Sequence, residues 1–144
     1  MKTPIISWYI KDNDDYIQDD EFYYGSVNPG LGVSLTIQVW NNRYGQSEVQ
    51  SISNARLAIY FENAEDSILL NYCTVRINEE IVSGIQKELN RLTVPLGTLS
   101  GEANSGLDNS NNKLNFKNVD IIFSDLPQNL KSGLKSMYLD IDVD

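Results

Sequence analysis

The chain has 144 residues, of which none is histidine and only one, Cys73, is cysteine. Without histidine the chain lacks the commonest general base, the commonest zinc ligand and every Ser–His or Cys–His nucleophile pair. A single cysteine excludes an internal disulfide. The glycines of "GSVNPGLG" are not followed by the Lys-Ser/Thr pair of a phosphate-binding loop. We therefore expect a protein that is not an enzyme and binds no cofactor.

Positive charge and long apolar runs are scarce as well. Eleven Lys and Arg residues stand against twenty Asp and Glu residues, so the net charge is −9. The cations are scattered from Lys2 to Lys135, which disfavours nucleic acid and anionic lipid as partners. No apolar stretch is long enough to span a bilayer, and the N-terminus lacks the pattern of a signal peptide. We expect the protein to be made and folded in a cytoplasm, without membrane contact.

Turn-forming residues and two-residue alternation are what the chain has in abundance. Asn and Ser are frequent, and Ile, Leu, Val and Tyr carry most of the apolar share. The clearest strand is "GVSLTIQVWN", with one apolar row and one mostly polar row: Val33, Leu35, Ile37 and Val39 against Ser34, Thr36, Gln38 and Trp40. The pattern predicts an all-β fold. We expect one antiparallel β-sandwich over residues 1–144, immunoglobulin-like or jelly-roll, with about seven to eight strands.

Two segments between the clear strands need separate interpretation. Apolar residues recur at helical spacing in "EEIVSGIQKELNRL", which favours one short helix near residues 79–92 over an extended crossover, although Val82 and Gly84 weaken the pattern. "SILLNYCTVRIN" reads as one long strand that buries Cys73 as a small hydrophobic residue.

Glycines are expected to shape two turns. They are Gly30 and Gly32 before the clearest strand, and Gly97 and Gly101 around "TLS". At least one of each pair should have positive φ or lie close to another backbone segment.

Acidic residues cluster in "DNDDYIQDDE" and along the final segment "KSMYLDIDVD". The first stretch lacks the ligand pattern of an EF-hand, so we expect a solvated loop; a non-standard calcium site is the alternative, with ligands from Asp12, Asp14, Asp15, Asp19 or Asp20. In the second, Asp140, Asp142 and Asp144 are spaced by about 7 Å along one face of a strand, too far apart for one ion. Its apolar row is expected to enter the core: Met137, Leu139, Ile141 and Val143. We expect no metal site.

The stretch "VWNNRYGQ" holds the candidate binding residues: Trp40, Asn41, Asn42, Arg43 and Tyr44. An exposed aromatic ring can stack on a sugar while amide and guanidinium groups bind its hydroxyls. This set could therefore bind a sugar or a partner. Alternatively, Trp40 closes an open end of the sandwich and the other residues form a turn.

Several stretches together carry a resemblance to a known class of domain: "SWYIKDND", "VNPGLGVSLTIQVWNN", "FENAEDSILL", "VPLGTLSG" and "DLPQNLKSG". The arrangement spans nearly the whole chain and resembles small immunoglobulin-like β-sandwich domains of tailed bacteriophages or prophages, which decorate heads, tails or fibres. The resemblance implies a non-enzymatic structural or decoration protein of a virion, assembled in the host cytoplasm. Its partners would be other virion or structural proteins, or copies of itself. The alternative function is a carbohydrate- or cell-surface-binding module, with a glycan as partner.

Overall fold

The computed structural model of the chain describes residues 2–11, 15–16, 21–27, 33–61, 64–124, 126 and 133–142. Its strands are β1 (Ile6–Ile10), β2 (Asp15–Tyr16), β3 (Glu21–Val27), β4 (Val33–Asn41), β5 (Ile52–Phe61), β6 (Cys73–Ile77), β7 (Glu80–Ile81), β8 (Gln86–Lys87), β9 (Leu92–Leu99), β10 (Phe116–Phe123) and β11 (Gly133–Asp142). Two 3₁₀ segments, η2 (Ala64–Tyr72) and η3 (Ser110–Asn112), lie between strands.

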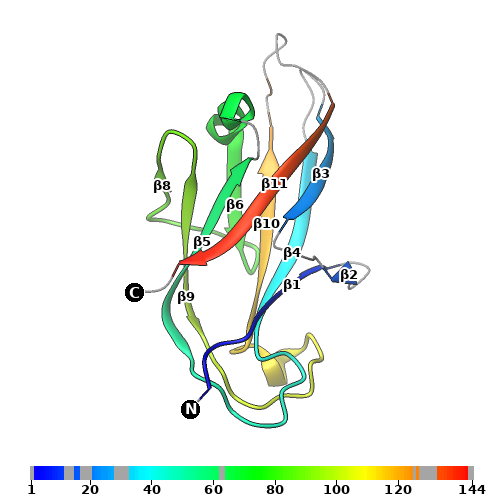
Figure 1. The fold of residues 1–144 in the computed structure, drawn as a ribbon, viewed down its shortest axis with the longest axis vertical. Helices are drawn as coiled ribbons and strands as arrows, with labels where there is room; N and C mark the ends of the chain where they lie inside the picture. Colours follow the sequence, from blue (N-terminus) through cyan, green and yellow to red (C-terminus); the bar gives the residue numbers. More distant parts are fainter. Residues whose placement is uncertain are drawn as a thin grey trace.

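The strands form two antiparallel sheets that pack against each other (Figure 1). The first has the order β2-β1-β4-β10-β6-β7 and the second the order β3-β11-β5-β9-β8. In the described part of the chain, eight strands have five to ten residues, and three two-residue strands lie at sheet ends. The predicted all-β sandwich is therefore confirmed. No helix among these residues is long and apolar enough to cross a membrane.

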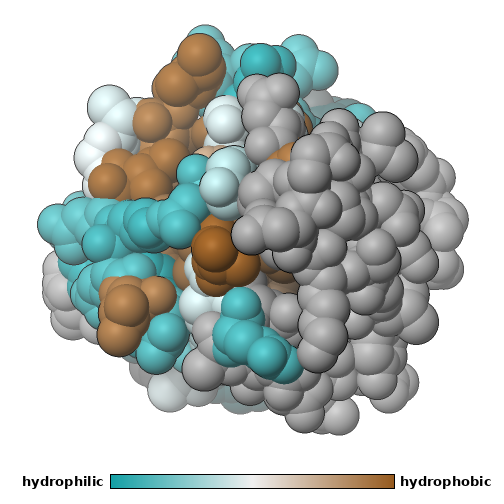
Figure 2. Space-filling view, turned by 90° about the horizontal axis from the view of Figure 1, so that it is seen from above, coloured by the Kyte–Doolittle hydropathy of each residue, from teal (hydrophilic) through white to brown (hydrophobic). Residues whose placement is uncertain are grey.

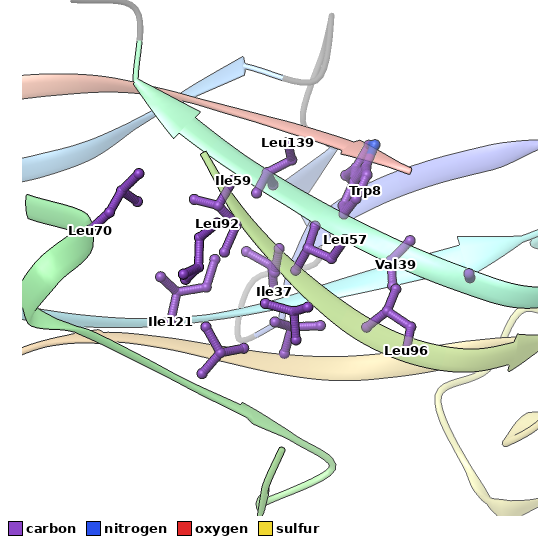
Figure 3. Packing of buried hydrophobic residues seen from close by; sticks show 14 of the residues in the cluster. Trp8, Ile37, Val39, Leu57, Ile59, Leu70, Leu92, Leu96, Ile121 and Leu139 are labelled. Carbon is purple, nitrogen blue, oxygen red and sulfur yellow. The ribbon is translucent and has the colours of Figure 1, made fainter. Parts of the chain in front are cut away.

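Alternation along the strands produces the core between the sheets. Ile37 and Val39 of β4 are fully buried, as is Ile121 of β10. Leu57 of β5 and Leu139 of β11 meet them from the second sheet, as Figure 3 shows. Burying each such side chain stabilises the fold by about 1.5–3 kcal/mol.

The register of β4 decides what lies on the outer face of the first sheet. Trp40 pairs with Phe116 and Gln38 with Asn118 on β10, while Tyr9 of β1 pairs with Gln38 from the other side. Because the alternate residues of β4 face the core, these five side chains share the opposite face. They form the base of the site described below.

The short helix expected near residues 79–92 is absent, and this prediction is wrong. Asn78 and Glu79 have positive φ, 51° and 70°, and form a tight turn between β6 and β7. The chain then crosses to β8, which pairs with β9. A helix here would need a surface for its apolar side, yet Ile81 is 79% exposed and Leu89 is 87% exposed. The alternative of an extended crossover describes the segment.

The prediction of one long strand over "SILLNYCTVRIN" is also wrong. Its first part belongs to η2, whose Leu69 and Leu70 are buried, and the strand begins only at Cys73. Cys73 lies at the start of β6, opposite Phe123. It is half-buried, whereas we expected it to be fully buried. Desolvation still raises the pKa of its thiol to about 12, although a backbone hydrogen bond from Ile122 opposes that shift. The thiol is therefore neutral and unreactive at ordinary pH.

The glycine prediction is confirmed for the second pair. Gly97 has a φ of +79°, and a Cβ atom on Gly101 would collide with the backbone of Val49. Gly30 and Gly32 lie outside the described residues.

The final segment forms β11, with Leu139 buried, Asp140 exposed and Ile141 half-buried. The predicted alternation is thus confirmed where side chains are described. The remaining positions lie outside that part: Val143 and Asp144, the side chains of Met137, Asp142 and Asp15, and Asp12, Asp14, Asp19 and Asp20 of the acidic loop. Within the described part, no three His, Cys, Asp or Glu side chains are grouped to hold a metal ion.

Candidate functional site

Trp40 lies beneath the surface, at the end of β4. Its side chain is fully buried, and its ring stacks on Phe116 with 4.5 Å between centroids and 23° between planes. The indole Nε1 donates a hydrogen bond of 3.1 Å to Oε1 of Gln38. The expected exposed ring is therefore not present, because pairing with β10 places another aromatic ring against it. Trp40 instead packs on the outer face of the first sheet, outside the core cluster between the sheets.

Asn41 is buried and holds three backbone segments together. Its Nδ2 donates to the carbonyl oxygens of Gln50, at 3.0 Å, and Leu99, at 3.2 Å. Its Oδ1 accepts from the backbone N–H of Ile5 at 3.0 Å. These bonds occupy the side-chain amide inside the protein, so Asn41 supports the site and does not face a ligand.

Asn42, the next residue, also holds backbone segments together. It is buried, with a φ of 62°, and its Nδ2 donates to the carbonyl of Gly101 at 3.0 Å. The side chain of Asn104 donates to the carbonyl of Asn42 at 2.8 Å and accepts from the backbone N–H groups of Tyr44 and Gly106, at 3.1 and 2.9 Å. Two loops more than fifty residues apart are joined in this way.

Two further asparagines of the same network were not singled out from the sequence. Asn115 is buried and donates to the carbonyls of Ser100 and Glu102, at 3.0 and 2.8 Å, and Asn112 donates to the carbonyl of Leu107 at 2.8 Å. The only signal was the density of Asn in "GEANSGLDNSNNK", which is equally typical of a solvated loop. The loops at this end of the sandwich are thus fixed by buried amides.

Arg43 and Tyr44 are the predicted residues that reach the surface. The Arg43 guanidinium lies over the rings of Tyr9, Trp40 and Tyr44, with 4.2, 4.6 and 5.0 Å to the centroids. Its Nε also donates to the carbonyl of Gly106 at 3.0 Å. Each cation–π contact contributes about 0.5–2 kcal/mol, depending on how dry it is. Tyr44 is 55% exposed, so the surface here combines a phenol ring with a fixed positive charge.

A hollow of about 400 Å³ opens on the outer face of the first sheet. Its lining comes from the β6–β7 turn, from the loop around η3 and from the start of β10: Asn78, Glu79, Asp108, Asn109, Ser110, Lys113, Phe116 and Asn118. We call this the β10 cleft. Buried Gln38 connects two of its sides, because its Nε2 donates to Asp108 at 3.1 Å and to Asn118 at 2.9 Å.

Apolar side chains also reach the surface away from the cleft. Leu89 after β8 and Ile81 of β7 are the most exposed of the described ones, and Ile68 of η2, which lies toward one end of the molecule, is 47% exposed. Figure 2 looks onto this end and shows apolar surface between hydrophilic areas. The described part therefore offers a polar hollow and, outside it, exposed apolar side chains.

Comparison with protein-family models, curated proteins and solved structures finds no match for this chain.

Proposed function

We propose that this protein is a non-catalytic structural or decoration component of a larger particle, such as a phage head, tail or fibre, and that it acts by contact with a partner protein. In this proposal the virion is its site of action. The contact surface is the crossover segment, residues 78–91, which runs from the β6–β7 turn through β7 and β8 to the start of β9.

The observation that carries the proposal is the exposure of Ile81 and Leu89, at 79% and 87%. Scattered apolar residues are common on surfaces, but these two lie on one short segment that also carries two sheet ends. Only residues 82–85 separate β7, at the end of the first sheet, from β8, at the end of the second. A partner that covered these side chains would gain about 1.5–3 kcal/mol for each one fully buried.

Charge favours a different protein as the occupant over a second copy. The chain has a net charge of −9, so two copies repel each other. The segment itself carries three acids and two bases, Glu79, Glu80 and Glu88 against Lys87 and Arg91. The fitting partner surface is apolar at its centre and has excess positive charge around it.

The test is co-expression with the products of neighbouring genes in the source genome. We expect one of them to co-purify with the wild-type chain. Replacing Ile81 and Leu89 together by Ser should weaken that complex about 30-fold or more, as for loss of interface hot spots. The matched control replaces Leu107 and Leu114, which are both 58% exposed outside the crossover segment, by Ser.

The proposal fails if no neighbouring product binds, or if the double variant and the control bind the partner equally. Sedimentation velocity of the chain alone adds a second measurement. Self-association removed by the Ile81 and Leu89 substitutions would show that the occupant is a second copy.

A further inference from the structure

The β10 cleft is built from parts that are fixed to one another. Asn78 donates its backbone N–H to the carbonyl of Asn118 at 2.8 Å and accepts the Asn118 N–H on its own Oδ1 at 3.0 Å. Gln38, at 1% exposure, ties Asn118 to Asp108 on the opposite side. These bonds hold both walls of the cleft against β10, the strand that forms its floor. The cleft is therefore already formed before a ligand binds.

The facing wall is also ordered by its own hydrogen bonds. Asn109 precedes η3 and accepts the backbone N–H of Asn111 on its Oδ1 at 3.0 Å. Buried Asn112 holds the loop through Ser105 and Leu107, with bonds of 2.7 and 2.8 Å. The wall carries exposed Asp108 and Lys113 on this fixed backbone.

The lining presents donors and acceptors in nearly equal measure. Glu79 and Asp108 supply carboxylate acceptors, Lys113 supplies an ammonium donor, and Ser110 supplies a hydroxyl. The side-chain oxygens of Asn78 and Asn109 already accept backbone bonds, which leaves their NH₂ groups as donors. One ring, Phe116, contributes an apolar edge.

This composition selects the chemistry of the ligand. Two carboxylates against one ammonium disfavour phosphates and other anions. Phe116 is the one apolar side chain among the lining residues, which disfavours a lipid chain, and two carboxylates alone do not form a metal site among the described residues. A hydroxyl group can donate to a carboxylate and accept from an ammonium or amide group. The volume of about 400 Å³ lies near the small end of the range of about 300–1,000 Å³ for ligand sites.

We infer that the β10 cleft binds a neutral polyhydroxylated ligand, a short saccharide unit. Glu79 and Asp108 accept from its hydroxyls, and Lys113, Asn78 and Asn109 donate to them. The cleft shares Asn78 and Glu79 with the start of the crossover segment but contains neither Ile81 nor Leu89, so it does not rest on the proposed protein contact.

The experiment is a titration of the isotope-labelled chain with maltotriose, cellotriose and chitotriose, each followed by amide proton–nitrogen NMR. We expect at least one sugar to cause saturable shifts at residues 78–79, 108–113 and 116–118. Replacing Glu79 by Gly and Lys113 by Met should weaken binding at least about tenfold, because charge-assisted hydrogen bonds are lost. Gly suits position 79, where φ is positive, so the variant should fold.

The matched control replaces Glu88 by Gly and Lys87 by Met, which changes the same charges on an exposed segment away from the cleft. Its affinity should equal that of the wild type. The inference is overturned if none of the three sugars causes saturable shifts, if the shifts centre on Tyr9 and Tyr44 instead, or if the cleft variant binds as well as the control.

Discussion

Gln38 allows the sharpest test of the architecture, because one buried amide serves three partners. Gln38→Met preserves the approximate volume but removes both ends of the amide. The indole of Trp40 is fully buried and would lose its 3.1 Å acceptor, at a cost of about 1–3 kcal/mol. Asp108 is exposed and can return to water, so its lost bond costs little. Asn118 is half-buried and adds up to about 1 kcal/mol. We expect a total loss of about 1–4 kcal/mol in unfolding free energy.

A double-mutant cycle with Trp40→Phe isolates the indole contribution. In the Phe background no indole N–H remains to be left unpaired, so Gln38→Met should cost about 1–2 kcal/mol less than in the wild type. Urea unfolding followed by circular dichroism measures all four proteins. Strict additivity of the two substitutions would refute the view that the Gln38 bond to the buried indole stabilises this face.

Three further predictions concern single features of the chain. Gly106→Ala should destabilise by about 2 kcal/mol or more, because φ is +79° and the new Cβ would meet the ring of Tyr44; Gly97→Ala, with the same φ and open space, should cost only about 1 kcal/mol in the same urea assay. Because the folded-state pKa of Cys73 is raised to about 12 from 9.0, the unfolded chain ionises first, so stability should fall as pH rises from about 9 toward 12. At pH 10 the wild type should lose on the order of 1 kcal/mol more than Cys73→Ala, and equal pH profiles would contradict this. Deleting residues 137–144 should abolish the cooperative thermal transition, because β11 lies between β3 and β5; a retained transition would show that the strand is dispensable for folding.

The strands were predictable because their pattern is local. In β4 a single alternation assigns every second residue to the core, and Ile37 and Val39 are buried as that pattern predicts. The final strand follows the same rule, with Leu139 inside and Asp140 outside.

Segment 78–91 shows where periodicity alone misleads. Ile81 and Leu89 match a helical stripe, but a stripe forms a stable helix only when a surface is present to cover it. Whether such a surface exists depends on the whole fold. Here strand pairing takes the place of a helix, because β6 pairs with β7 and β8 pairs with β9. The positive φ at Asn78 and Glu79 begins the turn one residue before the expected helix.

The candidate site was only half predictable, because asparagine is suited both to a ligand and to the protein's own backbone. Asn41 and Asn42 lie beside the surface residues Arg43 and Tyr44, but their amides bind carbonyls up to 60 residues away in the chain. No local pattern reveals such partners. In the β10 cleft the use of the amide differs, because among the described residues the side chains of Asn78 and Asn109 form hydrogen bonds only through their oxygens. Burial therefore separates the two roles: an amide enclosed by carbonyls stabilises a loop, whereas one that lines a hollow beside carboxylates and a lysine can recognise a hydroxyl group.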